Sequence, residues 1–367
     1  MMSKNGDKKI KLLLNAALAA VLIFVLVRVG SKPSSGSMLR TVLQLGAIYS
    51  LVAVSMNLLN GFTGLFSLGQ AGFMAVGAYT FAILTIPVKS KAGVYYLYGV
   101  NDVLKNVELP IIPALIIAGC MAAVFAAIIG SPVLRLKSDY FAIATLGFSE
   151  IVRILVASSP MATITNGSLG LKKIPGFPSY YFPFIIVAVC IALIVLLIHS
   201  SYGRAFKAIR EDEIAAEAMG ISLAKTKLLA FVISSFFAGI GGALLAMYLG
   251  SITSTTFPIK LTYDILLIVV IGGMGSVTGS VISSFLVVAS KEWWLRFLDQ
   301  EQYIGSFKVP LLKSGFRMVV FSVILMVVVL FFRQGIMGDK ELSWDKPIAF
   351  FRKHFAKKAG DTGANEK

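Results

Sequence analysis

Only one pair of ionisable residues lies well inside an apolar run of this 367-residue chain. Glu150 and Arg153 are three residues apart in the run Tyr140–Ser158, so they would share one face of a helix. Ionisable residues inside a membrane-spanning segment mark functional sites by default. Two charges of opposite sign at this spacing can also neutralise each other. A role in a translocation path and a purely structural ion pair are therefore both open.

The cysteines and histidines exclude most of the chemistry that these residue types perform. Cys120 and Cys190 lie in apolar runs, where a thiol behaves as a small hydrophobic group, and His199 and His354 are far apart. They form neither a metal-ligand spacing nor an activated nucleophile. The chain also has no Gly-x4-Gly-Lys-Ser/Thr phosphate-binding motif. We expect no catalytic residue, no metal and no cofactor, and a protein that is not an enzyme.

A charged segment between two apolar runs, residues 200–227, has the composition of a short helix that ends at Gly220. One face of this helix carries small and apolar residues, namely Ala205, Ala208, Ile209, Ala215, Ala216 and Met219. The face lacks the Trp, Leu and Phe side chains that would anchor it in lipid. The pattern favours a helix that docks in a shallow groove on another protein over one that lies on the membrane.

The composition identifies the elements that must position these residues. The chain is 57% hydrophobic and 14% charged, with a mean hydropathy of +0.84, whereas soluble domains carry roughly 25% charged residues. The charges are unequal, with 34 Lys and Arg against 18 Asp and Glu, a net charge of +16. Nucleic-acid binding would explain the basic excess but not the hydrophobicity, and disorder requires the opposite composition. The sequence predicts an all-α polytopic membrane protein that binds no nucleic acid.

Runs of about 20 apolar residues, the length of a membrane-spanning helix, occur eight times. They are Leu12–Val29, Met38–Leu59, Leu65–Ile86, Pro110–Gly130, Tyr140–Ser158, Tyr181–Ile198, Leu228–Leu249 and Gly315–Phe332. The first run is interpreted as a retained helix, because no small-residue cleavage site of a signal peptide follows it. With a ninth, interrupted stretch, we expect about 8–10 transmembrane helices.

The basic residues predict the orientation. If the N-terminus lies inside, the inner segments carry 19 Lys and Arg residues and the outer segments carry 12. Basic residues accumulate on the cytoplasmic side, so both termini and the 200–227 loop are expected there. We expect residues 1–337 to form one transmembrane domain and residues 338–367 to form a flexible basic tail near anionic lipid.

The ninth stretch, Thr262–Ala289, is interrupted by glycines at Gly272, Gly273 and Gly275. For the basic tail to lie inside, this stretch must begin and end on the same side of the membrane. Its 28 residues span roughly 42 Å as a helix, which is too short for two crossings of about 30 Å each. The sequence favours a re-entrant hairpin over a single long tilted helix.

A similar interruption, with Gly61 and Gly64, occurs in the first half of the chain. Two glycine-broken apolar segments in the two halves of a membrane protein indicate a path near the middle of the bilayer, although close helix packing would use the same small residues. The residues predicted to line this path are Asn57, Thr63, Ser67, Gln70, Glu150 and Arg153.

Several stretches in a shared order resemble one family. They are Gly61–Gly77, Ser138–Arg153, Asn166–Gly170, Gly203–Gly220 and Val270–Gly279. Together they are similar to the branched-chain amino-acid permeases of ABC importers, LivM type, from about Asn57 to the start of the tail. The general importer loop reads Glu-Ala-Ala, three residues, Gly. Here Ile214 takes the Glu position and Glu213 stands one place earlier, as is usual in the branched-chain subfamily. Arg333-Gln334-Gly335 lacks a proline that family members commonly have.

The resemblance implies an ABC importer permease architecture in a bacterial or archaeal inner membrane. It implies two ABC ATPase subunits that use ATP, a second permease of the related LivH type, and an extracytoplasmic substrate-binding protein as partners. It also implies a set of residues that couple the permease to the ATPase, namely Gly203, Arg204, Ala208, Arg210, Glu211, Asp212, Glu213, Ala215, Ala216, Glu217 and Gly220. The substrate stays open among branched-chain and other amino acids, urea and amides, and the two permeases of a complex could be the same chain. An ion- or proton-coupled secondary transporter of small polar solutes is the alternative, supported by the broken segments and Glu150.

Overall fold

The structure is a computed structural model that describes residues 28–30, 37–134, 138–294, 303–304, 307–308, 319–320, 322–323, 326, 335–338 and 341. The predicted spans Leu12–Val29 and Gly315–Phe332 lie largely outside the described residues, and so does nearly all of the tail 338–367. Both spans, and the proposed division of the chain at residue 338, stay predictions.

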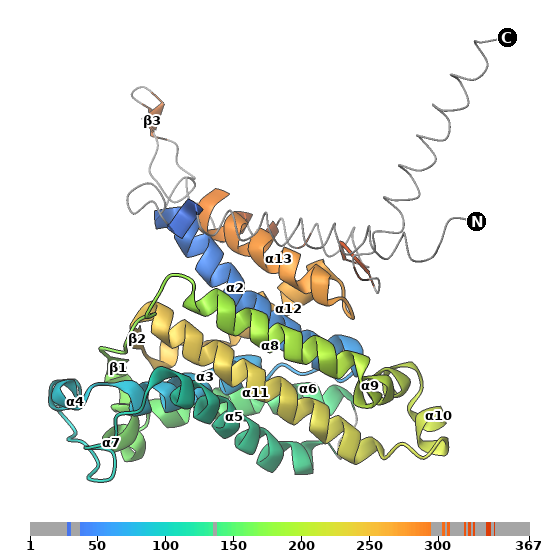
Figure 1. The fold of residues 1–367 in the computed structure, drawn as a ribbon, viewed down its shortest axis with the longest axis horizontal. Helices are drawn as coiled ribbons and strands as arrows, with labels where there is room; N and C mark the ends of the chain where they lie inside the picture. Colours follow the sequence, from blue (N-terminus) through green and yellow to red (C-terminus); the bar gives the residue numbers. More distant parts are fainter. Residues whose placement is uncertain are drawn as a thin grey trace.

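The described chain is mostly helical, as predicted (Figure 1). Its α-helices are α2 (Ser37–Asn57), α3 (Gln70–Thr85), α4 (Val88–Val94), α5 (Ile111–Val133), α6 (Ser138–Ala157), α7 (Ala162–Thr165), α8 (Phe182–His199), α9 (Ser201–Glu211), α10 (Glu213–Ala218), α11 (Leu223–Leu249), α12 (Ile259–Gly272) and α13 (Val277–Ala289). Short 3-10 and π turns are η1 (Leu58–Phe62), η2 (Ser159–Met161), η3 (Gly167–Leu169), η4 (Ser254–Thr256) and η5 (Ser290–Trp294). Two-residue strands pair antiparallel, β1 (Leu171–Lys172) with β2 (Ser251–Ile252) and β3 (Tyr303–Ile304) with β4 (Phe307–Lys308).

Helix α11 lies at the centre of the bundle, where it packs against α2, α3 and α5. Small residues permit this packing. A methyl group built on Gly77 would lie 2.2 Å from the carbonyl oxygen of Gly239, and one on Gly242 would lie 2.0 Å from that of Met74. Since lipid tails are as apolar as the side chains, such close backbone contact is what holds membrane helices together.

Within the described part of the chain, six helices are long and apolar enough to cross a membrane: Met38–Phe62, Ile111–Val133, Tyr140–Ala157, Phe182–His199, Leu223–Leu249 and Ser254–Gly272. The helices α3 and α4, which meet at a bend of 119°, raise the number to seven if they form one broken span. One predicted boundary was wrong. The span expected from Leu65 begins at Gln70, because Gly64 takes a left-handed conformation with φ of 77° and the residues up to Gly69 are not helical.

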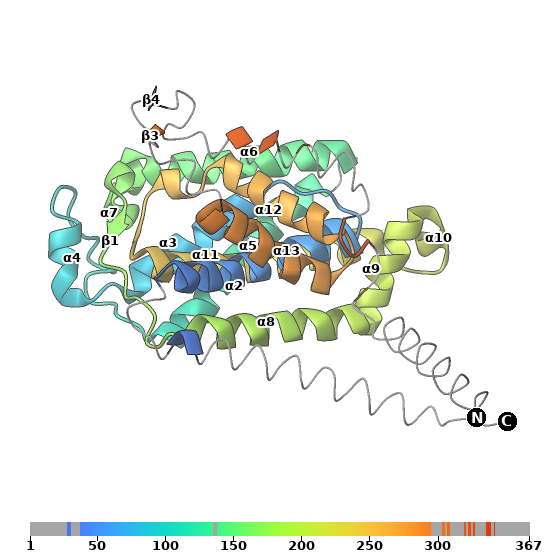
Figure 2. The same cartoon turned by 90° about the horizontal axis from the view of Figure 1, so that it is seen from above.

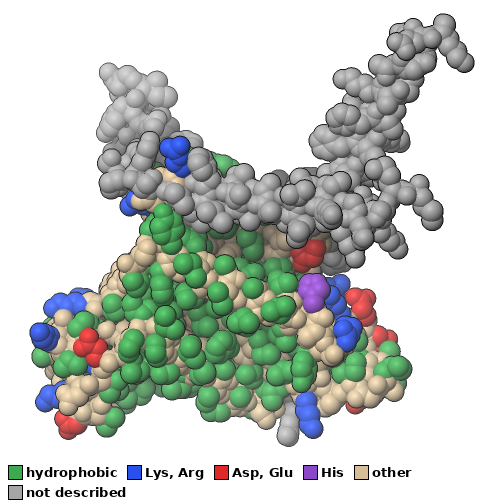
Figure 3. All heavy atoms as spheres, in the orientation of Figure 1, with side chains coloured by type: hydrophobic (Ala, Val, Ile, Leu, Met, Phe, Trp, Pro, Cys, Tyr) green, Lys and Arg blue, Asp and Glu red, His purple; other side chains and the backbone are tan. Residues whose placement is uncertain are grey.

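The outer surface agrees with insertion in a bilayer. Figure 3 shows a broad apolar face with charged side chains gathered at two opposite ends. Helices α4 and α7 lie at one of these ends and helices α9 and α10 lie at the other (Figure 2). Helices α5, α6 and α8 expose large apolar side chains such as Ile128, Ile143 and Leu196, each more than 60% exposed. An apolar belt between two polar ends is what a membrane-embedded protein presents to lipid.

The stretch Thr262–Ala289, which was predicted to form a hairpin, forms a helical hairpin. Helices α12 and α13 are antiparallel neighbours joined by the four residues from Gly273 to Ser276. Gly272 and Gly279 touch across the pair, and the hydroxyl of Ser283 donates to the carbonyl oxygen of Ile268 at 2.6 Å. The alternative of one long helix is therefore wrong, and each half is about 20 Å long.

Candidate functional site

The first break in the helical bundle, defined as residues 58–69, connects α2 to α3 through η1 and an extended chain. Most of it is buried, so its backbone N–H groups need partners within the protein. The N–H of Ser67 donates to Oδ1 of Asn60 at 3.1 Å, and the N–H of Leu68 donates to Oγ1 of Thr145 on α6 at 3.0 Å. Side chains from neighbouring helices thus replace the hydrogen bonds that a continuous helix would make.

The second break is the hairpin turn, Gly273–Ser276. Gly273 and Gly275 have φ angles of 108° and 97°, values that residues with a side chain rarely adopt. A methyl group on Gly273 would lie 2.4 Å from the carbonyl oxygen of Gly338. These two glycines make the tight reversal possible, which is the role expected for the glycine run.

Asn57 joins the two breaks. Its side chain is fully buried at the end of α2, and all its hydrogen bonds go to the second break or to the start of α13. The amide nitrogen donates to the carbonyl oxygen of Ser276 at 2.9 Å and to the hydroxyl of Ser280 at 2.8 Å. Its oxygen accepts from the N–H of Gly275 at 2.9 Å. One side chain therefore satisfies the N–H of Gly275, which the turn leaves without a helical partner, and adds a second bond to the carbonyl oxygen of Ser276, which also accepts from the N–H of Ser280 at 3.2 Å.

The other polar residues of the first break are also buried and engaged inside the protein. The hydroxyl of Thr63 donates to the carbonyl oxygen of Leu58 at 2.9 Å. Ser67 accepts from the N–H of Gly69 at 3.3 Å, and the amide of Gln70 donates to the hydroxyl of Ser55 at 2.7 Å. In this conformation these side chains form hydrogen bonds with polar groups in and beside the break. Their part in a translocation path stays a prediction.

Glu150 and Arg153 pair with each other on α6. Nε of Arg153 donates to Oε1 of Glu150 at 2.7 Å, and both side chains are about 30% exposed. The geometry is that of the self-neutralising pair, which was one of the two interpretations left open. A pathway role for them is not tested.

The segment predicted as one helix from Gly203 to Gly220 is two helices, α9 and α10. The chain is extended at Asp212 (φ −159°, ψ 113°), and the carboxylate of Asp212 accepts from the N–H groups of Ile214 and Ala215 at 2.8 and 3.0 Å. An aspartate that caps a new helix interrupts the old one. The predicted end at Gly220 is confirmed, because Gly220 has φ of 85° and the N–H of Ile221 bonds to the carbonyl oxygen of Ala216.

The break at Asp212 turns α10 away from the bundle, so the predicted single stripe does not exist. Ile209 and Ala216 are buried against the protein, whereas Ile214 and Met219 are 82% and 84% exposed. Figure 2 shows α10 projecting at the end of the molecule. Among the predicted coupling residues, the exposed ones are Arg204, Glu211, Asp212, Glu213, Ala215, Glu217 and Gly220, the partly buried ones are Ala208 and Arg210, and the buried ones are Gly203 and Ala216.

Helix α9 packs directly on the first break. Nη1 of Arg210 donates to the carbonyl oxygen of Gly61 at 2.9 Å, and the ammonium of Lys207 lies 5.7 Å from the centre of the Phe62 ring. A methyl group on Gly64 would lie 3.3 Å from Cα of Arg210. The sequence does not predict this contact, because it joins residues 149 positions apart.

The start of the tail packs on the second break. The N–H groups of Ile336 and Met337 donate to the carbonyl oxygens of Ile271 and Gly272 at 2.7 and 3.2 Å. The carboxylate of Glu341 accepts from the N–H of Val277 at 2.7 Å, at the N-terminus of α13. Negative charge is favourable at this end of a helix. The sequence gives no sign of this role, because Glu341 is one of several charged residues beyond the last predicted span.

The opposite end of the molecule is held by α4, α7 and the loops around them. The ammonium of Lys91 is buried and donates to the carbonyl oxygen of Leu104 at 2.6 Å. The amide of Asn166 donates to the carbonyl oxygens of Val94 and Gly170 at 3.0 and 2.7 Å. Burial raises the pKa of Tyr95 to about 12, so its hydroxyl stays protonated and donates to the carbonyl oxygen of Ile164.

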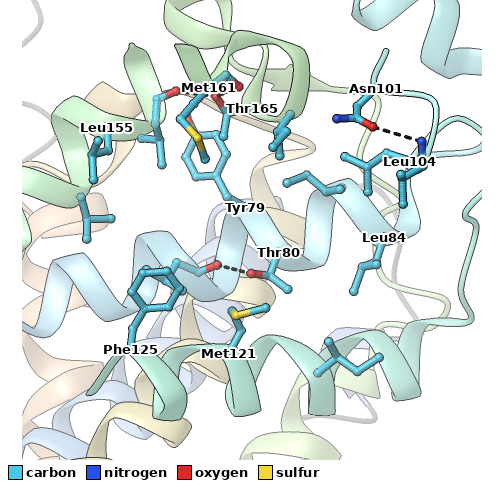
Figure 4. Close-up of a pocket in the computed structure, with 17 residues that line it drawn as sticks. Tyr79, Thr80, Leu84, Asn101, Leu104, Met121, Phe125, Leu155, Met161 and Thr165 are labelled. Carbon is cyan, nitrogen blue, oxygen red and sulfur yellow. Dashed lines mark hydrogen bonds between the residues drawn. The ribbon is translucent and has the colours of Figure 1, made fainter. Parts of the chain in front are cut away.

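A cavity of about 590 Å³ opens near this second end, between α3, α5, α6 and the loop around Asn101 (Figure 4). Its lining is apolar apart from Tyr79, Thr80, Asn101 and Thr165. Tyr79 points from α3 toward Met161 and Thr165. None of the predicted path residues lines it, and it offers no charged group to an amino-acid zwitterion. No cluster of three metal-ligating side chains occurs among the residues that the structure describes.

Residues 38–332 match the family described as branched-chain amino acid transport system, permease component. The chain belongs to this family. It is 36% identical over 279 residues to the high-affinity branched-chain amino acid transport system permease protein LivM of Escherichia coli (strain K12), a match that covers 67% of this chain and 61% of that relative.

Archaeal relatives match as well. The chain is 23% identical over 322 residues to a probable branched-chain amino acid transport permease protein LivM of Methanocaldococcus jannaschii, covering 80% of this chain and 92% of the relative. It is 24% identical over 271 residues to a probable LivH permease of the same organism, covering 69% and 80%. The chain spans about three fifths of the length of the bacterial LivM relatives it matches, and no solved structure matches it. In this chain, the two breaks and α9–α10 together form the candidate functional site.

Proposed function

We propose that this chain is the transmembrane permease subunit of an ABC importer that carries branched-chain or related amino acids. In this proposal ATP is bound and hydrolysed by two separate ABC ATPase subunits, and the permease itself needs no cofactor. The observation that carries the proposal is α10, a short capped helix that projects from the bundle and exposes Ile214 and Met219 at a charged end. Exposed apolar side chains at such a place suit burial against a partner protein.

Two further partners belong to the proposal. A second permease of the LivH type completes the membrane part, and an extracytoplasmic binding protein delivers the substrate to the end formed by α4 and α7. The family and the names of its LivM and LivH members support a system of several subunits. The excess of basic residues in the predicted inner segments supports an inner-membrane protein with both termini and α10 in the cytoplasm.

An ion-coupled secondary transporter is the weaker proposal. It would need an ionisable group that gains and loses a proton or binds an ion within the membrane. Glu150, the residue that motivated it, is already paired with Arg153. Helix α10 would also have no task in such a protein.

The test is co-purification of the ATPase with this chain after joint expression with the remaining subunits. We expect the double variant Ile214→Asp, Met219→Asp to lose the ATPase while it stays in the membrane, because charges replace the apolar contact. The matched control is Leu97→Asp, which alters a 59% exposed residue at the opposite end. ATPase recovery that is unchanged in the double variant would contradict the proposed docking, and amino-acid uptake that survives ATP depletion would contradict the importer.

A further inference from the structure

The contacts around Gly61 connect α9, the first break and the second break into one continuous set. We propose that Arg210 and Asn57 are positioning residues that transmit the displacement of α9 and α10 to both breaks, so that the two breaks rearrange together. The inference rests on the proposed function, because transmission is needed only if a partner drives the permease from α10.

The first step of the linkage runs from α9 to the first break. The guanidinium of Arg210 bonds to the carbonyl oxygen of Gly61, one of the last carbonyl groups of the helix that ends at Phe62. Such terminal carbonyls lack helical partners, and a cationic donor satisfies them strongly. The backbone at Gly64 lies close against Arg210, since a Cβ atom built on Gly64 would make a tight contact of 3.3 Å with Cα of Arg210. A shift of α9 therefore displaces the break by direct contact as well as by the hydrogen bond.

The second step runs from the first break to the hairpin turn. A methyl group on Gly61 would lie 1.9 Å from Oδ1 of Asn57 and 2.4 Å from the backbone nitrogen of Gly275. Asn57 in turn bonds to Gly275 and Ser276. The residue held by Arg210 is thus the same residue that packs on both Asn57 and the second break.

The linkage is stiff because its parts are in direct contact, Asn57 and Gly61 are buried, and its polar groups are bonded. Close-packed interiors have low compressibility, so a displacement at one side is passed on. Helix α10 is fixed to the same body, since Asp212 joins it to α9 and the carboxylate of Glu213 pairs with the ammonium of Lys227 on α11 at 2.6 Å. A force on the exposed face of α10 consequently reaches α9 without an intervening mobile segment.

Arg210 then transmits movement from α9 to the first break and does not dock the ATPase. Its side chain is 29% exposed, with one guanidinium nitrogen on Gly61 and the other 3.4 Å from Glu211. If Arg210 contacts the ATPase, its removal weakens assembly. If Arg210 transmits movement, its removal leaves assembly intact and lowers the number of amino acids transported for each ATP hydrolysed.

The experiment uses the full complex in proteoliposomes, with uptake of radiolabelled leucine and ATP hydrolysis measured on the same preparation. We expect Arg210→Met to lower the ratio of uptake to hydrolysis about fivefold or more, a typical size for coupling between sites, with unchanged recovery of the ATPase. Arg210→Lys keeps the positive charge but loses the planar guanidinium group. We expect its ratio of uptake to hydrolysis to lie between those of the wild type and Arg210→Met. Lys225→Met, which removes an exposed basic residue from the start of α11, is the matched control.

A second variant allows one and the same protein to be compared in its oxidised and reduced forms. An ideal Cβ atom on Gly64 lies 3.5 Å from Cβ of Arg210, within the range of a disulfide. We expect the double variant Gly64→Cys, Arg210→Cys, with Cys120 and Cys190 replaced by serine, to couple better when oxidised than when reduced. The covalent bond then replaces the contact between α9 and the first break.

The outcomes separate the two proposals. An unchanged ratio in Arg210→Met, or equal ratios in the oxidised and reduced double variant, overturns the linkage and leaves the proposed function standing. Loss of the ATPase from Arg210→Met overturns it in favour of docking. Arrest of the oxidised double variant overturns it too, because α9 and the break must then move apart. A wild-type chain that recovers no ATPase contradicts the proposed function itself.

Discussion

Both breaks leave backbone groups without helical hydrogen bonds, and the two breaks satisfy these groups in different ways. The first is a long extended connection whose backbone groups are satisfied mostly by side chains of its own and of α6, as at Ser67 and Leu68. The second is a four-residue turn between antiparallel helices, held from outside by Asn57 on one side and the start of the tail on the other. Asn57 and Gly61 touch both.

This difference indicates that most substitutions disturb only one of the breaks. Substitutions of Asn57 or Gly61 are expected to disturb both. An extended segment with many local hydrogen bonds tolerates the loss of one of them. A tight turn depends on glycine conformations and on few external partners. Residues at the contact between the breaks should therefore have the largest effects, and residues bonded within one break should have smaller and local ones.

The largest effect is expected for Gly61→Ala. The added methyl group would lie 1.9 Å from Asn57 and 2.4 Å from the backbone of Gly275, and neither can move without disturbing both breaks. We expect a loss of at least about 3 kcal/mol in the free energy of unfolding, measured by denaturation in mild detergent. Gly147→Ala is the control, because no atom lies within 4 Å of the new methyl group there. Similar stabilities of the two variants would show that the breaks do not pack as described.

The second prediction concerns Asn57→Ala. It removes the hydrogen bonds to Gly275, Ser276 and Ser280 and leaves the buried N–H of Gly275 without this partner, whereas the hydroxyl of Ser280 still donates to the carbonyl oxygen of Ser276. We expect a cost of about 2–4 kcal/mol, with faster amide hydrogen exchange in both breaks. Asn101→Ala, in a loop at the other end, should cost less than about 1 kcal/mol. Faster exchange in one break alone would refute the joint role of Asn57.

The third prediction concerns Thr63→Val, which keeps the shape of the side chain and removes its hydrogen bond to Leu58. We expect a cost of about 1 kcal/mol and faster hydrogen exchange in the first break only. Exchange at residues 273–278 should match the wild type. Any increase there would mean that the first break passes on disturbances without help from Asn57.

The smallest effect is expected for Glu341→Gln, which removes the negative charge at the N-terminus of α13. We expect a cost of about 0.3–1 kcal/mol and faster exchange of the N–H groups of Val277 and Thr278 only. Combined with Thr63→Val, the two costs should add within about 0.5 kcal/mol, because the sites share no partner. Strong non-additivity in this double-mutant cycle would contradict their independence.

Much of the bundle could be predicted because a membrane span is recognisable from the apolar composition of one continuous stretch of residues. The hairpin followed from the glycine run together with the basic tail, and the end of α10 followed from Gly220. The interruption at Asp212 was missed, since periodicity gives an aspartate no sign of whether it is exposed in a helix or caps one. The site itself was predicted only in part. Glycines and polar residues stood out, but the partners of Asn57 and Arg210 lie 149 or more positions away, and no local pattern records such pairs.

The bonds of Asn57 also have a consequence for how the protein is made. Asn57 is synthesised 218 residues before Gly275, which at 5–20 residues per second means roughly 10–40 s of translation. Throughout that time its amide has none of its final partners, although the helix that carries it is one of the first of the described spans to enter the membrane. Until the hairpin is inserted, this amide must bond to water or to other transient partners, because an unpaired polar group in the bilayer core is costly. A chain that stops before the hairpin therefore carries an Asn57 amide without its final partners.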